Sequence, residues 1–281
     1  MTEPTAHALP RPRPPRVLVF DSGVGGLSVL TEIRARVPGC ELVYACDNGA
    51  FPYGTKNEGD LVERVDRVLR ALVAETAPDI VVIACNTAST VALPRIRTHF
   101  HKPVVGVVPA IKPAAKLSRT RVIGLLGTAG TVSRPYTQQL IDEFAADCTV
   151  LRLGSARLVE MAEDKLRGMA PNPAELRDII SPLFAGPDVV GTNVDTLVLA
   201  CTHFPLLAAE LAAAAPHPVH WVDSGEAIAR RVLSLLPAGG DPAIQPATGF
   251  DCWLTAAGAD FAALEAGLLR FGGQRLRLLV P

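Results

Sequence analysis

Short runs of aliphatic and β-branched residues alternate along the chain with segments in which apolar positions recur every three to four residues. The first unit has a strand-like run at 17–20, a glycine-rich turn, and a predicted helix over 27–37 that ends at Pro38. Further strand-like runs lie at 41–46, 80–85 and 104–108, and a second helix is predicted around 61–72. This alternation is typical of an α/β fold with a parallel, doubly wound sheet and helices on both faces.

The second half of the chain starts the same pattern again. The segment "RVIGLLGTAGTVS" (121–133) resembles "RVLVFDSGVGGLS" (16–28), and "LVLACTH" (197–203) resembles "IVVIACN" (80–86). We therefore predict two similar doubly wound parallel-sheet lobes that face each other across a central cleft. The first lobe is assigned to 16–109 plus 224–281 and the second to 110–223, with hinges near "VVPAIKPA" and "HWVDSGEA" that permit closure.

Composition limits the function classes. The 281 residues are 49% hydrophobic and 20% charged, enough to bury a large core. A net charge of −1 gives no electrostatic reason to expect a nucleic acid or an anionic membrane as a partner. Residues 1–15 form a proline-rich leader that is predicted to be disordered and that lacks the apolar core of a signal peptide.

One apolar segment, 196–216, is long enough to suggest a membrane span. It contains Thr202, His203 and Glu210, and Pro205 divides it into a strand and a separate Ala/Leu-rich helix. We therefore predict a cytoplasmic protein.

The six cysteines are too few for a disulfide scaffold, and no Cys-x-x-Cys or His-x-x-His spacing suggests a metal site. Cys85 and Cys201 each follow an alanine at the end of a predicted buried strand. A single cysteine at such a place is most often an inert small hydrophobic residue. Two of them, each followed by hydroxyl or amide residues, favour a functional interpretation. The other four, Cys40, Cys46, Cys148 and Cys252, are interpreted as structural.

In open α/β sheets a ligand binds beyond the carboxyl ends of the strands. Lobes that face each other would bring together the polar residues that follow four strands, namely Asp21, Ser22, Cys85, Asn86, Thr87, Thr128, Thr131, Cys201, Thr202 and His203. Opposed thiols suit the inversion of a carbon stereocentre, in which a base removes a proton on one face and an acid delivers one on the other. A thiol, with an ordinary pKa of about 8.5, can serve in either state once its surroundings tune it.

Alternative interpretations remain for the glycine-rich turn, for Glu160 and for the two-lobed architecture. The turn "DSGVGG" (21–26) could bind phosphate, but it lacks the G-x-G-x-x-G spacing and a following Walker lysine, so a tight turn with Asp21 as a helix N-cap is the simpler reading. Glu160, considered by itself, is predicted to be a solvent-exposed helix residue. A non-enzymatic two-lobed ligand-binding protein would also use such lobes, but it would have no use for opposed thiols.

Six motifs in order, "VFDSGVGGLSVL", "FPYGTK", "IACNTAS", "GTAGTV", "LVEMAED" and "ACTHFPLL", resemble the bacterial glutamate racemases of the aspartate/glutamate racemase superfamily. The resemblance runs from about Arg16 to about Asp223. It implies a cofactor-independent enzyme that interconverts L- and D-glutamate and supplies D-glutamate for peptidoglycan. A homodimer is expected on the same ground. Racemases of other amino acids such as aspartate are the alternative, whereas a decarboxylase of the superfamily is expected to keep only one active cysteine.

The resemblance also implies roles for individual residues. Cys85 would act on the D-isomer with help from Asp21, and Cys201 on the L-isomer with help from His203, which Glu160 would orient. Ser22, Asn86, Thr87 and Thr202 would hold the α-amino and α-carboxylate groups. The γ-carboxylate would meet Pro52, Tyr53 and Gly54 together with Thr128 and Thr131.

Overall fold

The computed structural model describes residues 13–37, 39–185, 194–236, 249–258 and 260–281. Its strands form two separate sheets, and every strand pair is parallel. The first sheet contains β1 (Arg16–Asp21), β2 (Glu41–Cys46), β3 (Ile80–Ile83), β4 (Val104–Gly106), β9 (Phe250–Leu254) and β10 (Gly273–Leu278). The second contains β5 (Val122–Gly127), β6 (Thr149–Gly154), β7 (Thr196–Ala200) and β8 (His220–Val222).

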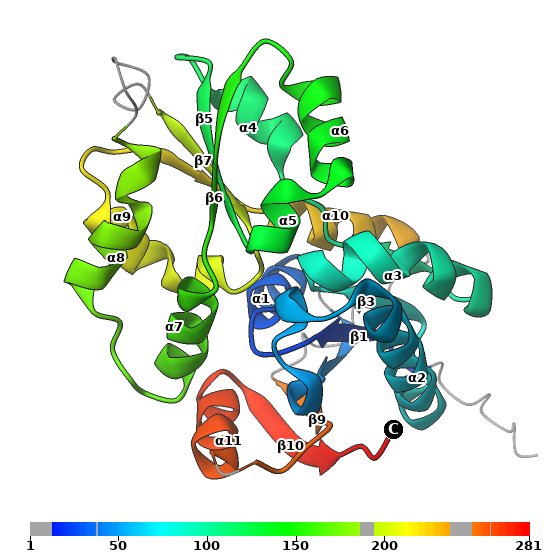
Figure 1. The fold of residues 1–281 in the computed structure, drawn as a ribbon. Helices are drawn as coiled ribbons and strands as arrows, with labels where there is room; N and C mark the ends of the chain where they lie inside the picture. Colours follow the sequence, from blue (N-terminus) through cyan, green and yellow to red (C-terminus); the bar gives the residue numbers. More distant parts are fainter. Residues whose placement is uncertain (1–12, 38, 186–193, 237–248, 259) are drawn as a thin grey trace, which may run out of the picture.

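The strand orders show that the second sheet repeats part of the first. The orders are β10-β9-β2-β1-β3-β4 and β6-β5-β7-β8, so β5 lies between β6 and β7 as β1 lies between β2 and β3. The two pairs of similar sequence segments therefore occupy equivalent strands in the two sheets. The predicted α/β fold with two similar parallel-sheet lobes is confirmed, and Figure 1 shows the lobe of β5–β8 above the lobe of β1–β3.

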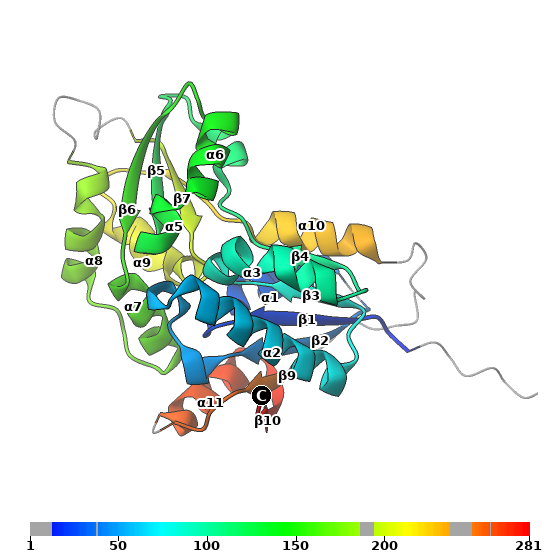
Figure 2. The ribbon, with the colours of Figure 1, turned by 45° about the vertical axis from the view of Figure 1, so that its right-hand side comes forward.

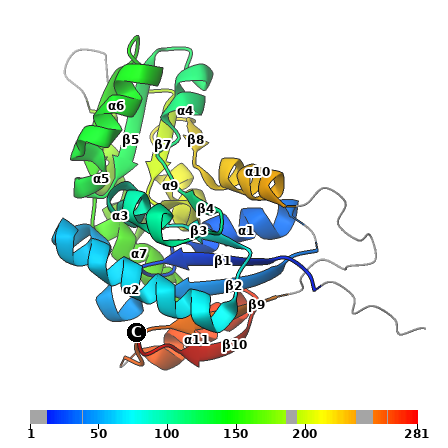
Figure 3. The same cartoon turned by 90° about the vertical axis from the view of Figure 1, so that its right-hand side faces the viewer.

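Helices cover both faces of each sheet (Figures 1 and 2). On the first sheet, α1 (Leu27–Arg36), α10 (Gly225–Leu235) and α11 (Phe261–Arg270) lie on one face, and α2 (Glu58–Thr76) and α3 (Asn86–His99) on the other. On the second sheet, α7 (Arg157–Leu166), α8 (Pro173–Ile180) and α9 (Ala208–Ala214) lie opposite α4 (Ile111–Leu117) and α6 (Pro135–Phe144). The short helix α5 (Ala129–Ser133) follows β5. Figure 3 shows both sheets from the side.

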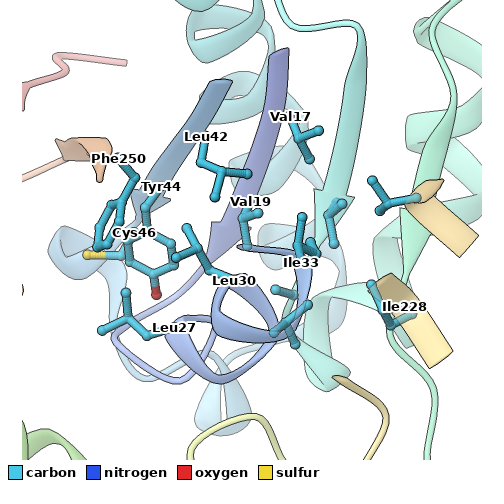
Figure 4. Close-up of a cluster of buried hydrophobic side chains, with 14 of the residues drawn as sticks. Val17, Val19, Leu27, Leu30, Ile33, Leu42, Tyr44, Cys46, Ile228 and Phe250 are labelled. Atoms are coloured by element: carbon cyan, nitrogen blue, oxygen red, sulfur yellow. The ribbon is translucent and has the colours of Figure 1, made fainter. Parts of the chain in front are cut away.

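The alternation of side chains along β1 explains why residues 17–20 are all apolar. Val17 and Val19 pack against α1, whereas Leu18 and Phe20 pack against α2 and α3 on the other face. Figure 4 shows the cluster on the α1 side, where Leu27, Leu30 and Ile33 meet β1 and β2. The sequence of a strand that is buried on both faces is a continuous run of hydrophobic residues. The apolar run ends at Phe20, and Asp21, the last residue of β1, is the first polar residue beyond it.

The apolar segment 196–216 is divided as predicted. It forms β7, a 3₁₀ turn at Phe204–Leu207 that contains Pro205, and the separate helix α9. Across the described ranges, none of the helices has both the length and the apolar character needed to span a bilayer.

Candidate active site

A cavity of about 160 Å³ lies between the two lobes, at the carboxyl ends of their central strands. Both cysteines singled out from the sequence line it. The lining residues are Ser22, Phe51, Pro52, Tyr53, Gly54, Thr55, Cys85, Asn86, Thr87, Thr128, Ala129, Thr131, Ala156, Val159, Glu160, Cys201, Thr202 and His203. Every residue predicted for the site is among them except Asp21, which lies buried behind Ser22. The other four cysteines are not among these lining residues.

The strand order explains why the cavity forms here. In each sheet the chain reverses its direction of winding at the central pair, β1/β3 in the first and β5/β7 in the second. Loops diverge at such a switch point and leave a crevice beyond the strand ends. Cys85 follows β3 and begins α3, whereas Cys201 follows β7. The cavity therefore receives one thiol from each lobe.

Asp21 organises the first thiol's surroundings. Its Oδ1 accepts the N–H of Ser22 at 2.6 Å, and its Oδ2 accepts the N–H of Gly26 at 2.6 Å. The hydroxyl of Ser22 lies 3.4 Å from Asp21 Oδ1 and 4.0 Å from Cys85 Sγ. Asp21 is not the N-cap of α1, which is Gly26. The N-cap alternative is therefore wrong, and the carboxylate instead serves the turn beside Cys85.

The second thiol faces a buried histidine. Nδ1 of His203 lies 3.8 Å from Cys201 Sγ, and Nε2 of the same ring lies 3.0 Å from Glu163 Oε1. Glu163 also accepts the backbone N–H of Val24 and pairs with Arg167 at 3.0 Å. The expectation that Glu160 orients this histidine is wrong. The Glu160 carboxylate is largely exposed at the cavity rim and pairs with Arg157. Glu163, one helical turn further along α7, has that position.

Charge within this buried group sets the pKa values. Burial opposes charge on His203, but its hydrogen bonds to Cys201 and Glu163 outweigh this and raise its pKa well above the usual value. Burial also works against the charge of Glu163, yet the pairing with His203 leaves the pKa of Glu163 lowered. The pair is therefore an imidazolium and a carboxylate. A protonated Nδ1 of His203 faces the Cys201 sulfur.

The first thiol has different electrostatics. Burial raises the pKa of Cys85 well above its usual value, and the negative charge of Asp21 raises it further. Burial likewise raises the pKa of Asp21, although His203 and the backbone N–H groups act in the opposite direction. Cys85 is thus held as a thiol beside a carboxylate of increased basicity. The two cysteines sit in unlike surroundings, as an acid and a base on opposite sides of one ligand require.

The glycine-rich turn between β1 and α1 allows the second lobe to come close. A Cβ at Gly25 would lie 2.3 Å from His203 Nδ1, and a Cβ at Gly23 would lie 2.1 Å from Glu163 Oε1. Thr202 donates its hydroxyl to Asp21 Oδ2 at 3.2 Å, and its carbonyl accepts from Ser28 at 2.8 Å. Gly23 and Gly25 are therefore needed for close contact between the lobes.

A third group of lining residues comes from the 52–55 loop and the start of α5. The hydroxyls of Thr128 and Thr131 lie 2.9 Å apart, and a Cβ at Gly54 would meet Thr128 at 3.5 Å, an ordinary contact. The hydroxyl of Tyr53 does not face a ligand but donates to Asp47 at 2.7 Å. Arg64 holds the same carboxylate through two nitrogens, at 2.6 and 2.9 Å. This buried network holds the 52–55 loop against the first lobe.

Sequence reasoning missed several lining residues. Phe51 lies within the motif "FPYGTK", and its ring centroid is 5.9 Å from that of His203. Val159 lies within "LVEMAED", and Ala129 within "GTAGTV". Each was inside a recognised motif, which was the only signal available for it. Among the residues that the structure describes, no cluster of His, Cys, Asp and Glu could hold a metal ion.

Comparison with known proteins places this site in a family. The sequence profile described as Asp/Glu/Hydantoin racemase matches residues 27–232. The chain belongs to this racemase family. It is 55% identical over 225 residues to the glutamate racemase of Pectobacterium carotovorum, covering 80% of this chain and 78% of that protein. It is 53% identical over 233 residues to the glutamate racemase of Salmonella typhimurium, covering 83% and 81%.

Solved structures agree with this assignment. The crystal structure of Escherichia coli glutamate racemase in complex with L-glutamate and the activator UDP-MurNAc-ala has a TM-score of 0.87 and 47% identity, covering 95% of this chain and 98% of that one. Glutamate racemase from Thermus thermophilus has a TM-score of 0.71 and 28% identity, covering 95% and 97%. The family membership expected from the six motifs is confirmed.

Proposed function

We propose that the protein is a glutamate racemase that interconverts L- and D-glutamate by proton transfer between two cysteines, without a cofactor, and that it supplies D-glutamate for peptidoglycan. The observation that carries the proposal is the placement of Cys85 and Cys201, which come from equivalent strands of the two lobes and line one cavity of about 160 Å³. Relatives named glutamate racemase at 53–55% identity support the choice of substrate.

The positions of the two thiols suggest how racemisation begins in each direction. One cysteine, as thiolate, removes the α-proton, and the other, as thiol, delivers a proton to the opposite face of the planar carbanion. Asp21, whose pKa is raised by burial, is the acceptor for the proton that leaves Cys85. The imidazolium of His203 faces the Cys201 sulfur at 3.8 Å and can donate to it. In the proposed assignment Cys85 acts on D-glutamate and Cys201 on L-glutamate.

The polar groups around the cavity would bind the two ends of the substrate. Ser22, Asn86, Thr87 and Thr202 lie beside the thiols and would hold the α-amino and α-carboxylate groups. Asn86 Oδ1 is buried and has no hydrogen-bond partner among the described residues, so an ammonium donor would satisfy it. Gly54, Thr128 and Thr131 would hold the γ-carboxylate. Such donors stabilise the developing negative charge if they are already in place before the reaction.

Deuterium exchange at the α-carbon tests the proposal. The wild-type protein, incubated in deuterated water with D- or L-glutamate and no added cofactor, is expected to racemise both and to incorporate deuterium. Cys85→Ser and Cys201→Ser are both expected to lose racemisation. Cys85→Ser is expected to fail to remove the α-proton of D-glutamate, and Cys201→Ser that of L-glutamate. Activity that survives either substitution would refute the two-thiol mechanism. Turnover of aspartate in place of glutamate would refute the substrate.

Three finer expectations remain proposals. The homodimer rests on the resemblance alone, and the cytoplasmic location rests on the proposed role in supplying a cell-wall precursor. The lobe boundaries at 109/110 and 223/224 are proposed because the strands of the first sheet lie within 16–106 and 250–278, and those of the second within 122–222.

A further inference from the structure

The two thiols lie deep in the cavity, whose rim is exposed at Thr55, Ala129 and Glu160, so parting of the lobes would widen the path to them. Cys85 and Cys201 are 6% and 7% exposed. A closed cleft between two lobes needs contacts that can break and re-form without unfolding either lobe. Such contacts are found where polar side chains, rather than a continuous apolar core, join the lobes.

An arginine of the second lobe reaches the first lobe beside this cavity. Nε of Arg134, in the link between α5 and α6, lies 3.2 Å from Oε1 of Glu58, the first residue of α2. Arg134 is three residues beyond Thr131, and Glu58 is three residues beyond Thr55. The ion pair therefore joins the two segments that line the γ-carboxylate end of the cavity.

The two side chains of this ion pair differ in exposure, because Glu58 is 66% exposed whereas Arg134 is largely buried. The Arg134 side chain is 14% exposed and lies over Gly130, where a Cβ would be 3.4 Å from its Nη1. Within the described part of the chain, that buried Nη1 has no hydrogen-bond partner. A buried guanidinium with an unused donor costs free energy, so the stability of the second lobe does not account for it.

The boundary between the two lobes is not filled by side chains next to the ion pair of Arg134 and Glu58. A second cavity of about 370 Å³ follows the same boundary between lobes, lined by Glu58, Gly59, Val62, Thr90, Val91, Arg134, Pro135 and Tyr136. The space beside the ion pair is lined in part by Val62, Val91 and Tyr136, and the pair can break there without disturbing the buried cluster beneath α2 and α3.

We propose that Arg134 is a positioning residue that clasps the lobes together at the γ-carboxylate end of the cavity through Glu58. The proposal rests on the proposed function for its substrate. The clasp holds the 128–131 segment against the 52–55 loop, so the donors for the side-chain carboxylate are in place when the cleft is closed. Its loss increases the time the cleft spends open and weakens binding of both enantiomers, while the thiol chemistry is unchanged.

The first test needs no substrate. The rate at which iodoacetamide alkylates Cys85 and Cys201, mapped by mass spectrometry, reports how often the cleft opens. Arg134→Gln and Glu58→Gln are each expected to increase this rate about threefold to fivefold, the size expected for one partly exposed ion pair. The double variant is expected to react no faster than Arg134→Gln, and the charge swap Arg134→Glu with Glu58→Arg is expected to restore much of the protection.

The second test uses glutamate. Arg134→Gln is expected to raise KM for D- and L-glutamate by about the same threefold to fivefold, with kcat within about twofold of wild type. Arg230→Gln, which removes a solvent-exposed ion pair within α10, is the matched control and is expected to change neither quantity. Unchanged alkylation rates in Arg134→Gln, or effects of the two single variants that simply add, would overturn the clasp. Absence of glutamate turnover by wild type would instead refute the proposed function, because the alkylation result stands without it.

Discussion

Oε1 of Glu163 lies 3.0 Å from Nε2 of His203 and so joins the second lobe's helix α7 to the histidine beside Cys201. The same oxygen accepts the backbone N–H of Val24 in the first lobe at 2.7 Å. One carboxylate thus fixes the imidazole and spans the boundary between lobes.

Replacement of Glu163 by Gln is expected to reduce kcat by about tenfold or more, below the 10²–10⁴-fold typical of losing the acid/base group itself. The neutral amide no longer stabilises the imidazolium, so the pKa of His203 falls toward its usual value. Racemisation kinetics and an NMR titration of His203 would measure both effects. Glu160→Gln is the matched control on the same helix, and we expect it to retain near wild-type kcat. Equal loss in the two variants would contradict the role of Glu163.

The raised pKa of His203 makes stability depend on pH. Because its pKa is higher in the folded state than in the unfolded state, the protonated ring stabilises the fold fully below the unfolded value of about 6.5. That contribution is lost as the pH rises through the raised folded value. Melting temperatures of wild type and His203→Gln, compared from pH 6 upward, are expected to differ less as the pH increases. A constant difference across this range would show that the ring is not protonated in the fold.

Gly25→Ala is expected to abolish most activity and to reduce stability. Its Cβ would lie 2.3 Å from His203 Nδ1 and 2.7 Å from the backbone N of His203, and the backbone atom cannot move aside cheaply. Gly258→Ala, where a Cβ meets nothing within 4 Å, is the control and is expected to behave as wild type. Thermal unfolding and glutamate racemisation would be measured for both. A fully active Gly25→Ala would mean that the lobes do not need this close approach.

Asp47→Asn tests the network that holds the 52–55 loop. Asp47 is completely buried and accepts from Tyr53, Arg64 and Thr255, so its replacement is expected to reduce the free energy of unfolding by about 1–3 kcal/mol. We also expect KM for glutamate to rise, because Tyr53 and Gly54 line the cavity. Urea denaturation and kinetics would measure these, with the exposed Glu226→Gln as control. A stable variant with an unchanged KM would argue against the network.

Asp47 should also contribute to stability in acid. Burial works against its charge, but hydrogen bonds from Arg64, Thr255 and Tyr53 leave its pKa lowered. A carboxyl with a lower folded pKa stabilises the fold above its unfolded value, near 3.9, and loses this contribution as the pH falls through the folded value. Wild type is therefore expected to lose more stability than Asp47→Asn as the pH falls below about 4. Equilibrium unfolding at pH 2–5 would show whether the two curves converge.

The sequence by itself determined the architecture and most of the site. Short apolar runs rich in β-branched residues favour strands buried on both faces, and a parallel sheet places their carboxyl ends, with Cys85 and Cys201, at one edge of each lobe. Repetition of the pattern predicted that two such edges exist. Short-range physics is sufficient for these inferences, because strand burial and helix periodicity are properties of local sequence.

Only the tertiary structure decided which acidic residue on α7 reaches the histidine. Glu160 and Glu163 are three residues apart, which places them on neighbouring parts of one helical face, and the rotation of α7 against the sheet turns Glu163 inward and Glu160 outward. Gly23 and Gly25 of the "DSGVGG" turn are explained in the same way, since the nearest atoms that exclude a Cβ belong to Glu163, His203 and Thr202 of the other lobe. The pair of Arg134 and Glu58 is likewise invisible in sequence. Contacts between lobes depend on how two separately folded surfaces meet, and no local pattern encodes that geometry.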